Sequence, residues 1–123
     1  ESPAPKPTPA TAAPTGRIDH RTAADFEAAL APLLAQAGAS HGALVLDFSG
    51  VDYISSVGLR VLMIAAKQMR AAQARLSVAA LSSVVAEIFT ISRFDKVLTV
   101  NATLEDALAQ ASDAALAAYR ARP

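Results

Sequence analysis

Residues 46–60 read Leu46-Asp47-Phe48-Ser49-Gly50-Val51-Asp52-Tyr53-Ile54-Ser55-Ser56-Val57-Gly58-Leu59-Arg60, and this stretch decides the fold. With the preceding Ala43-Leu44-Val45 it opens on a nearly continuous apolar run, which is typical of a strand buried on both faces. A Ser-Gly turn and a short apolar return follow, and two serines then open a helix. The stretch therefore predicts a central parallel strand at 43–48 that leads to a helix start.

A helix is also expected before that strand. Asp19 or Thr22 would cap it, and it would run to about residue 37, with Gly38 after its end. Pro32 lacks a backbone N–H and should kink or loosen it. Its buried face is predicted from apolar side chains at helical spacing, namely Phe26, Leu30, Leu33 and Leu34.

The segments after the strand continue to alternate. We expect further strands at 76–80 and 97–100, and helices at 57–69, at 82–91 and from Thr103 toward Tyr119. Strands that alternate with helices through short connections imply right-handed crossovers. The predicted fold class is therefore α/β, a small mixed β-sheet with helices packed mainly on one face.

Composition divides the chain into three segments. Residues 1–15 are proline-rich, which favours an extended tail or degenerate first strands. If they do supply a strand, Pro14 restricts its pairing to a sheet edge or to irregular bonding, because proline donates no ladder hydrogen bond. Residues 16–110 form the predicted domain, and the alanine-rich residues 111–123 are expected to extend the last helix.

Charge and composition exclude several classes of function. The 11 Lys and Arg residues balance the 11 Asp and Glu residues, so no basic excess points to nucleic acid. Cysteine is absent, which excludes disulfides and thiolate metal ligands. No apolar run approaches the roughly 20 residues that cross a bilayer, and the opening segment does not resemble a signal peptide. We expect a cytoplasmic protein without direct membrane insertion.

Catalysis and metal binding are not predicted. His20 and His41 have no motif around them, and the glycines of residues 46–60 lack the spacing of a phosphate-binding loop. Asp47 and Asp52 lack an apparent third ligand, so we predict no metal site. No cofactor is implied.

Ser55 and Ser56 stand where a predicted helix begins. Free backbone N–H groups gather at such a position, and with the helix dipole they would stabilise a phosphoryl group by about 0.3–2 kcal/mol. Judged from spacing alone, plain N-capping is the commoner role of serines at a helix start. Both roles stay open at this point.

The stretch Asp47 to Arg60 resembles the signature segment of STAS domains in bacterial anti-sigma-factor antagonists, where an apolar strand leads to a serine pair, Gly-Leu and an apolar helix. The likeness continues in order at residues 16–19, 71–76 and 82–100, and it covers about residues 16–110. Two departures stand out. Family members begin with two strands where this chain is proline-rich, and the chain continues past the family's usual end.

The resemblance implies a STAS-like fold and a non-catalytic binding protein. In the family, the middle residue of a three-residue group before Gly-Leu is phosphorylated, which carries that role onto Ser56, with Ser55 as the alternative. The unphosphorylated form would sequester an anti-sigma factor that is also a serine-protein kinase, and a PP2C-type phosphatase would reset it. The residues expected to bind the partner are Asp19, Asp52, Ser55, Ser56, Val57 and Gly58.

A second role is compatible with the same resemblance. STAS domains also serve as scaffolds or as regulatory subunits of membrane transporters, without a phosphorylation cycle. The serine at the middle position and the absence of a predicted transmembrane segment favour the antagonist.

Overall fold

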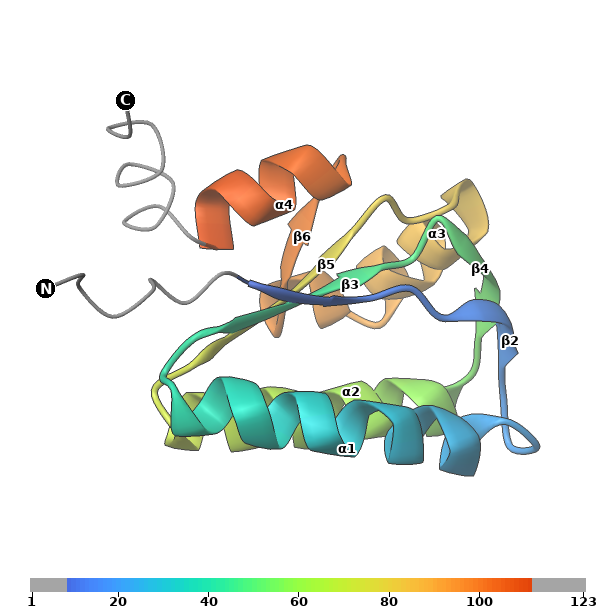
Figure 1. The fold of residues 1–123 in the computed structure, drawn as a ribbon. Coiled ribbons are helices and arrows are strands. Elements are labelled where there is room, and N and C mark those ends of the chain that lie inside the picture. The colour runs from blue at the N-terminus through green and yellow to red at the C-terminus, as the bar shows by residue number, and fades with distance from the viewer. Residues whose placement is uncertain (1–8, 112–123) are drawn as a thin grey trace, which may run out of the picture.

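The computed structural model describes residues 9–111, which form strands and helices in alternation (Figure 1). In chain order the elements are β1 (Ala10–Ala12), β2 (Thr15–Ile18), α1 (Ala23–Ala39), β3 (Ala43–Asp47), β4 (Gly50–Ile54), α2 (Ser56–Ala71), β5 (Arg75–Ala79), α3 (Ser83–Ile91), the 3-10 helix η1 (Phe94–Lys96), β6 (Thr99–Asn101) and α4 (Leu104–Ala111).

A four-stranded sheet in the order β1-β3-β5-β6 forms the centre. Every described strand pair is parallel, where a mixed sheet was expected. The predicted central strand is β3, and Leu44, Val45 and Leu46 are fully buried in it. This burial on both faces explains the continuous apolar run, and the α/β class is confirmed.

Strands β2 and β4 form a separate two-stranded ribbon that continues β1 and β3 beyond the sheet (Figure 1). Pro14 lies between β1 and β2, and the pairing register of β2 with β4 shifts between Gly16 and Arg17. The proline-rich segment thus supplies β1 at the sheet edge, as expected for a strand beside a residue without an N–H. Strand β4 is an addition, since the sequence indicated only a short apolar return there.

Helices cover both faces of the sheet. Helices α1 and α2 lie side by side on one face and α4 lies on the other, where helices mainly on one face were expected (Figure 1). The larger core lies under α1 and α2, and a smaller one beneath α4 contains Val45, Ala79 and Ala107. Alternate residues of β3 therefore serve two cores, which explains why α4 is needed on the second face.

A chain of aromatic contacts joins the helices to the sheet. Phe48, which follows β3, makes edge-to-face contacts with Phe26 of α1 and Phe89 of α3, with ring centroids 6.4 Å apart in both pairs. Phe89 in turn contacts Phe94 of η1 at 5.3 Å. These contacts fix the end of the sheet from which β4 departs toward α2.

The predicted end of α1 was wrong by two residues. The helix continues through Pro32 and Gly38 to Ala39. A Cβ on Gly38 would stand 3.3 Å from Ala72 Cβ, so this glycine serves the close approach of α1 to the end of α2. The left-handed residue after the helix is His41, with φ of 53°.

Other boundaries shift by one or two residues. Strand β5 ends at Ala79 because Ala80 adopts a positive φ of 60°. The last strand begins at Thr99 rather than 97, since η1 and its bond from Leu98 N–H to Phe94 O occupy the preceding segment. Thr103 caps α4 as predicted, its Oγ1 accepting from Asp106 N–H at 3.0 Å, whereas the predicted extension toward Tyr119 lies outside the described residues.

Candidate functional site

The two serines at the start of α2 have different environments. Ser55 is the N-cap residue, with extended backbone angles, and its half-buried hydroxyl accepts from Gly58 N–H at 3.4 Å. Ser56 is the first helical residue and is exposed. The structure therefore uses the Ser55 hydroxyl as a cap and leaves the Ser56 hydroxyl facing solvent.

Gly58 holds this helix start against the ribbon. A Cβ at Gly58 would stand 2.7 Å from side-chain carbons of both Ile18 and Ile54, and 3.2 Å from the Ile18 carbonyl oxygen. Both isoleucines are almost fully buried. Only glycine permits so close an approach, which explains why Gly58 belongs to the site although it lies beneath the surface.

The turn after β2 lies next to the serines. Ile18 and Ile54 pair in the ribbon, and Ser55 N–H donates to Ile18 O at 2.8 Å. This brings Asp19, the next residue after Ile18, to the same end of the ribbon as Ser55. Two segments some 35 residues apart in sequence thus meet at the start of α2.

Asp19 is held by its own turn. Its Oδ1 accepts from Arg21 N–H at 2.9 Å, and its Oδ2 lies 3.6 Å from Arg17 Nε. The Arg21 N–H holds the pKa of the Asp19 carboxyl below its usual value of 3.8. Desolvation raises this pKa, whereas Thr22 and the charges of His20 and Arg17 lower it further by smaller amounts. Asp19 therefore carries a negative charge at neutral pH. Thr22, not Asp19, is the N-cap residue of α1.

Asp52 and Tyr53 face outward from β4. Asp52 is exposed, four residues before Ser56 in the chain. The Arg17 guanidinium carbon lies 4.5 Å from the centre of the Tyr53 ring, a cation–π contact across the paired strands. This contact was not predictable from the sequence, because it depends on the register of two strands that are distant in sequence.

Ser56 lies between the half-buried Ser55 and the exposed Val57. The neighbouring Val57 is 42% exposed, and the first turn of α2 contains no acidic side chain. The partial positive charge of the helix N-terminus is therefore not offset within the helix itself. Such a position can accept a phosphoryl group on an exposed hydroxyl without moving a buried side chain.

Metal clusters and membrane-spanning helices are absent from residues 9–111. These residues contain no group of three or more His, Cys, Asp or Glu side chains placed to hold a metal ion. In the same residues no helix has the length and apolar character to cross a membrane.

Comparisons with known proteins agree on one family. A family model described as "Mlab, STAS domain" matches residues 11–105. The chain is 39% identical over 94 residues to BtrV of Bordetella bronchiseptica, provisionally named an anti-sigma factor antagonist, with 76% of this chain and 78% of that one covered. It is 27% identical to an anti-sigma factor antagonist from Mycobacterium paratuberculosis, whose crystal structure gives a TM-score of 0.72 over 82% of this chain and 83% of that chain.

A transporter domain has the same fold. The STAS domain of a SulP transporter from Vibrio cholerae gives a TM-score of 0.66 at 19% identity, over 94% of this chain and 86% of that chain. At this identity the likeness shows the fold alone, so the local chemistry of the site has to separate the two roles.

Proposed function

This chain belongs to the STAS domain family, and we propose that it acts as an anti-sigma-factor antagonist whose binding is switched by phosphorylation of Ser56. In this proposal the unphosphorylated chain sequesters an anti-sigma factor that is also a serine kinase. A PP2C-type phosphatase restores the binding form. The relatives named as anti-sigma factor antagonists support the binding role.

One observation carries the choice of Ser56. Its side chain is exposed at the first position of α2, whereas the Ser55 hydroxyl already accepts a hydrogen bond from Gly58 N–H. A kinase reaches an exposed hydroxyl without breaking the cap. The phosphoryl group adds about −1.5 to −2 charges at neutral pH, and the N-terminus of α2 accommodates that charge. The fold survives while the surface changes.

The same charge opposes binding. Val57 gives the partner an exposed apolar side chain beside Ser56, and the exposed part of the ribbon adds the charged side chains of Arg17 and Asp52. A dianion beside Val57 must be desolvated when the partner docks, and the carboxylates of Asp19 and Asp52 add to the negative potential there. Phosphorylation therefore weakens binding by at least about tenfold, since burying an unpaired charge costs more than 1.4 kcal/mol.

In this proposal the chain only binds, and its partner kinase and phosphatase carry out the catalysis. Of the two carboxylates assigned to the site, Asp19 is engaged by Arg21 N–H and Asp52 is exposed to solvent on β4. Purified chain should hydrolyse no ATP. Hydrolysis that disappears on mutation of a residue in this chain would contradict the non-enzyme role.

Calorimetric titration of the cognate anti-sigma factor into the wild type and three variants tests the proposal. Wild type and Ser56→Ala should bind equally in the absence of ATP, and Ser56→Asp should bind at least about tenfold more weakly while its circular dichroism spectrum stays native. Ser55→Ala is the matched control and should lose less affinity than Ser56→Asp. Equal binding by all four chains would favour a scaffold without a phosphorylation cycle.

A further inference from the structure

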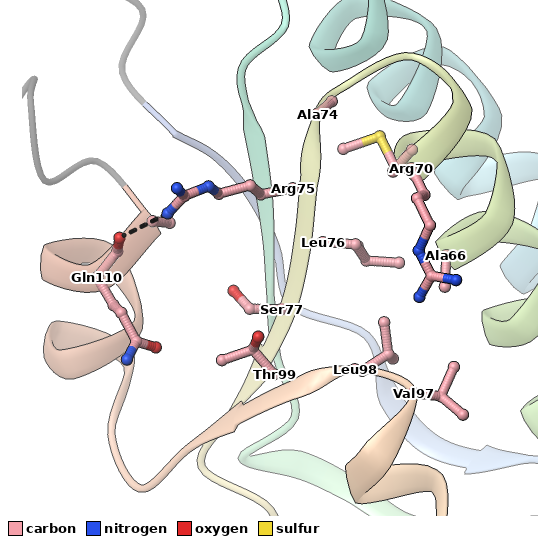
Figure 2. Close-up of a pocket in the computed structure, with 12 residues that line it drawn as sticks. Ala66, Arg70, Ala74, Arg75, Leu76, Ser77, Val97, Leu98, Thr99 and Gln110 are labelled. Carbon is pink, nitrogen blue, oxygen red and sulfur yellow. Dashed lines mark hydrogen bonds between the residues drawn. The ribbon is translucent and has the colours of Figure 1, made fainter.

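A cavity of about 430 Å³ lies at the opposite end of α2 from the serines (Figure 2). Its volume falls within the range of roughly 300–1,000 Å³ that is usual for small-molecule sites. It arises because β6 begins to pair with β5 only at Ser77, opposite Thr99, so that the two residues before Ser77 have no partner in β6. The cavity occupies the space beside this unpaired part of β5.

The charged side chains that line the cavity are all positive. Arg70 near the end of α2 and Arg75 at the start of β5 line the cavity, and none of its lining residues is acidic. Arg75 donates from Nη1 to the main-chain oxygen of Gln110 at 3.3 Å (Figure 2). Within residues 9–111 the ion pair found is that of Arg17 with Asp19, so neither arginine has a carboxylate partner there. In a chain of zero net charge, this is a local excess of cations.

Within residues 9–111, one buried hydroxyl in the lining has no hydrogen-bond partner. Ser77 is 6% exposed, and its Oγ makes no hydrogen bond. Figure 2 shows its hydroxyl on the side of β5 that also holds Thr99 and the Arg75 side chain. Buried polar groups in native proteins almost always have a partner, so an unpaired one beside a cavity indicates a missing ligand or water.

The other side of the lining combines apolar side chains with the aliphatic stem and guanidinium of Arg70. Leu76 and Leu98 point away from Ser77, toward the side where Ala66 and the Arg70 side chain lie, and Met69 also lines the cavity (Figure 2). An occupant must therefore combine an acceptor group for guanidinium N–H donors with hydrocarbon for the apolar wall. Arginine binds planar oxyanions through paired hydrogen bonds, which suits a carboxylate.

We propose that this cavity binds a small organic oxyanion, a monocarboxylate on a short hydrocarbon chain. The carboxylate accepts hydrogen bonds from Arg75 and from the hydroxyls of Ser77 and Thr99 on the same side of β5, and the hydrocarbon packs on Leu76, Leu98 and Met69. The site does not depend on the role of Ser56, since its residues lie at the other end of α2 and on β5, β6 and α4.

Amide NMR titrations of the full chain with three probes test this proposal. Hexanoate should shift the amide signals of cavity residues 74–77 and 97–99 in a saturable way. Inorganic phosphate lacks the hydrocarbon and hexylamine lacks the anion, so each should bind at least about tenfold more weakly, as expected when one of two complementary groups is lost. Equal saturation by hexylamine, or by inorganic phosphate, would overturn the assignment of an organic oxyanion.

Variants locate the site. Arg70→Gln with Arg75→Gln should weaken hexanoate binding by at least about tenfold, the usual effect of losing charge-assisted contacts. Lys67→Gln removes an exposed cation from the same helix outside the cavity and should leave the affinity unchanged. Undiminished binding by the double variant, equal loss with Lys67→Gln, or no saturable hexanoate shift in the wild type would refute the proposal.

Discussion

The two ends of helix α2 differ in how closely they are packed. At its start, Gly58 lies so near Ile18 and Ile54 that a single added carbon would stand 2.7 Å from each. At its end, a cavity of about 430 Å³ adjoins Arg70, and the nearby Ser77 hydroxyl has no partner. The difference shows that one helix can be packed tightly against a ribbon at its start and leave an open cavity beside its end.

Adding volume at the packed end should have the largest effect. Gly58→Ala places a carbon against two buried isoleucines and should lower the free energy of unfolding by about 1–3 kcal/mol, as overpacking generally does. Gly38→Ala is the matched control, because its added carbon would meet Ala72 Cβ at 3.3 Å and should cost less. Urea denaturation measures both. A Gly58→Ala variant as stable as the wild type would contradict the tight packing.

Removing the cap should destabilise the fold less than Gly58→Ala does. Ser55→Ala deletes the acceptor for Gly58 N–H and should lower the free energy of unfolding by about 0.5–1 kcal/mol, the low end for an N-cap because the bond is 3.4 Å long. Ser56→Ala alters an exposed side chain and should change it by no more than about 0.5 kcal/mol. Thermal denaturation of the two variants measures both changes. Equal losses of stability in Ser55→Ala and Ser56→Ala would contradict a capping role that belongs to Ser55 alone.

At the end of α2 that adjoins the cavity, a substitution should raise the stability of the fold instead of lowering it. Ser77→Ala removes a buried hydroxyl that makes no hydrogen bond, so the free energy of unfolding should rise by about 1 kcal/mol. Ser83→Ala, at an exposed position, provides the comparison and should stay within about 0.5 kcal/mol of the wild type. If Ser77→Ala destabilises the chain instead, the hydroxyl has a partner, and the cavity loses one argument for an occupant.

The smallest expected effect is a pH dependence of stability that comes from Asp19. The pKa of Asp19 is lowered in the folded chain by Arg21 N–H, so its charge stabilises the fold above the usual value of 3.8, and this contribution is lost as the pH falls through the lower folded value. Asp19→Asn should therefore be less stable than the wild type near neutral pH, and the gap should close below pH 3.8. Urea titrations at several pH values measure the gap, and a gap that widens in acid would contradict it.

The start of α2 was predictable because its signals are local. Apolar residues 43–48, the Ser-Gly turn and the serine pair follow one another in 15 or so residues, and each has its own backbone preference. The structure confirms the buried strand β3 and the helix that begins at Ser56. Strand β4 was missed because a short strand in a two-stranded ribbon needs a partner, and that partner, β2, lies beyond α1.

The cavity was not predictable from the same signals. Its lining comes from residues 66–77, 97–99 and 110–111, which meet only after β5 and β6 pair. In the sequence, Arg70 and Arg75 are indicative of a solvated helix face and a strand entrance. The register of two parallel strands, on which their grouping depends, is not determined by any local pattern.

Phosphosite mapping by tandem mass spectrometry tests the central claim most directly. The chain is incubated with its cognate anti-sigma kinase and ATP, digested, and the fragments that separate Ser55 from Ser56 are measured, with Ser56→Ala as the control. The account predicts phosphate on Ser56 in the wild type and none on the segment in Ser56→Ala. Phosphate on Ser55 alone, or on neither serine, would contradict it.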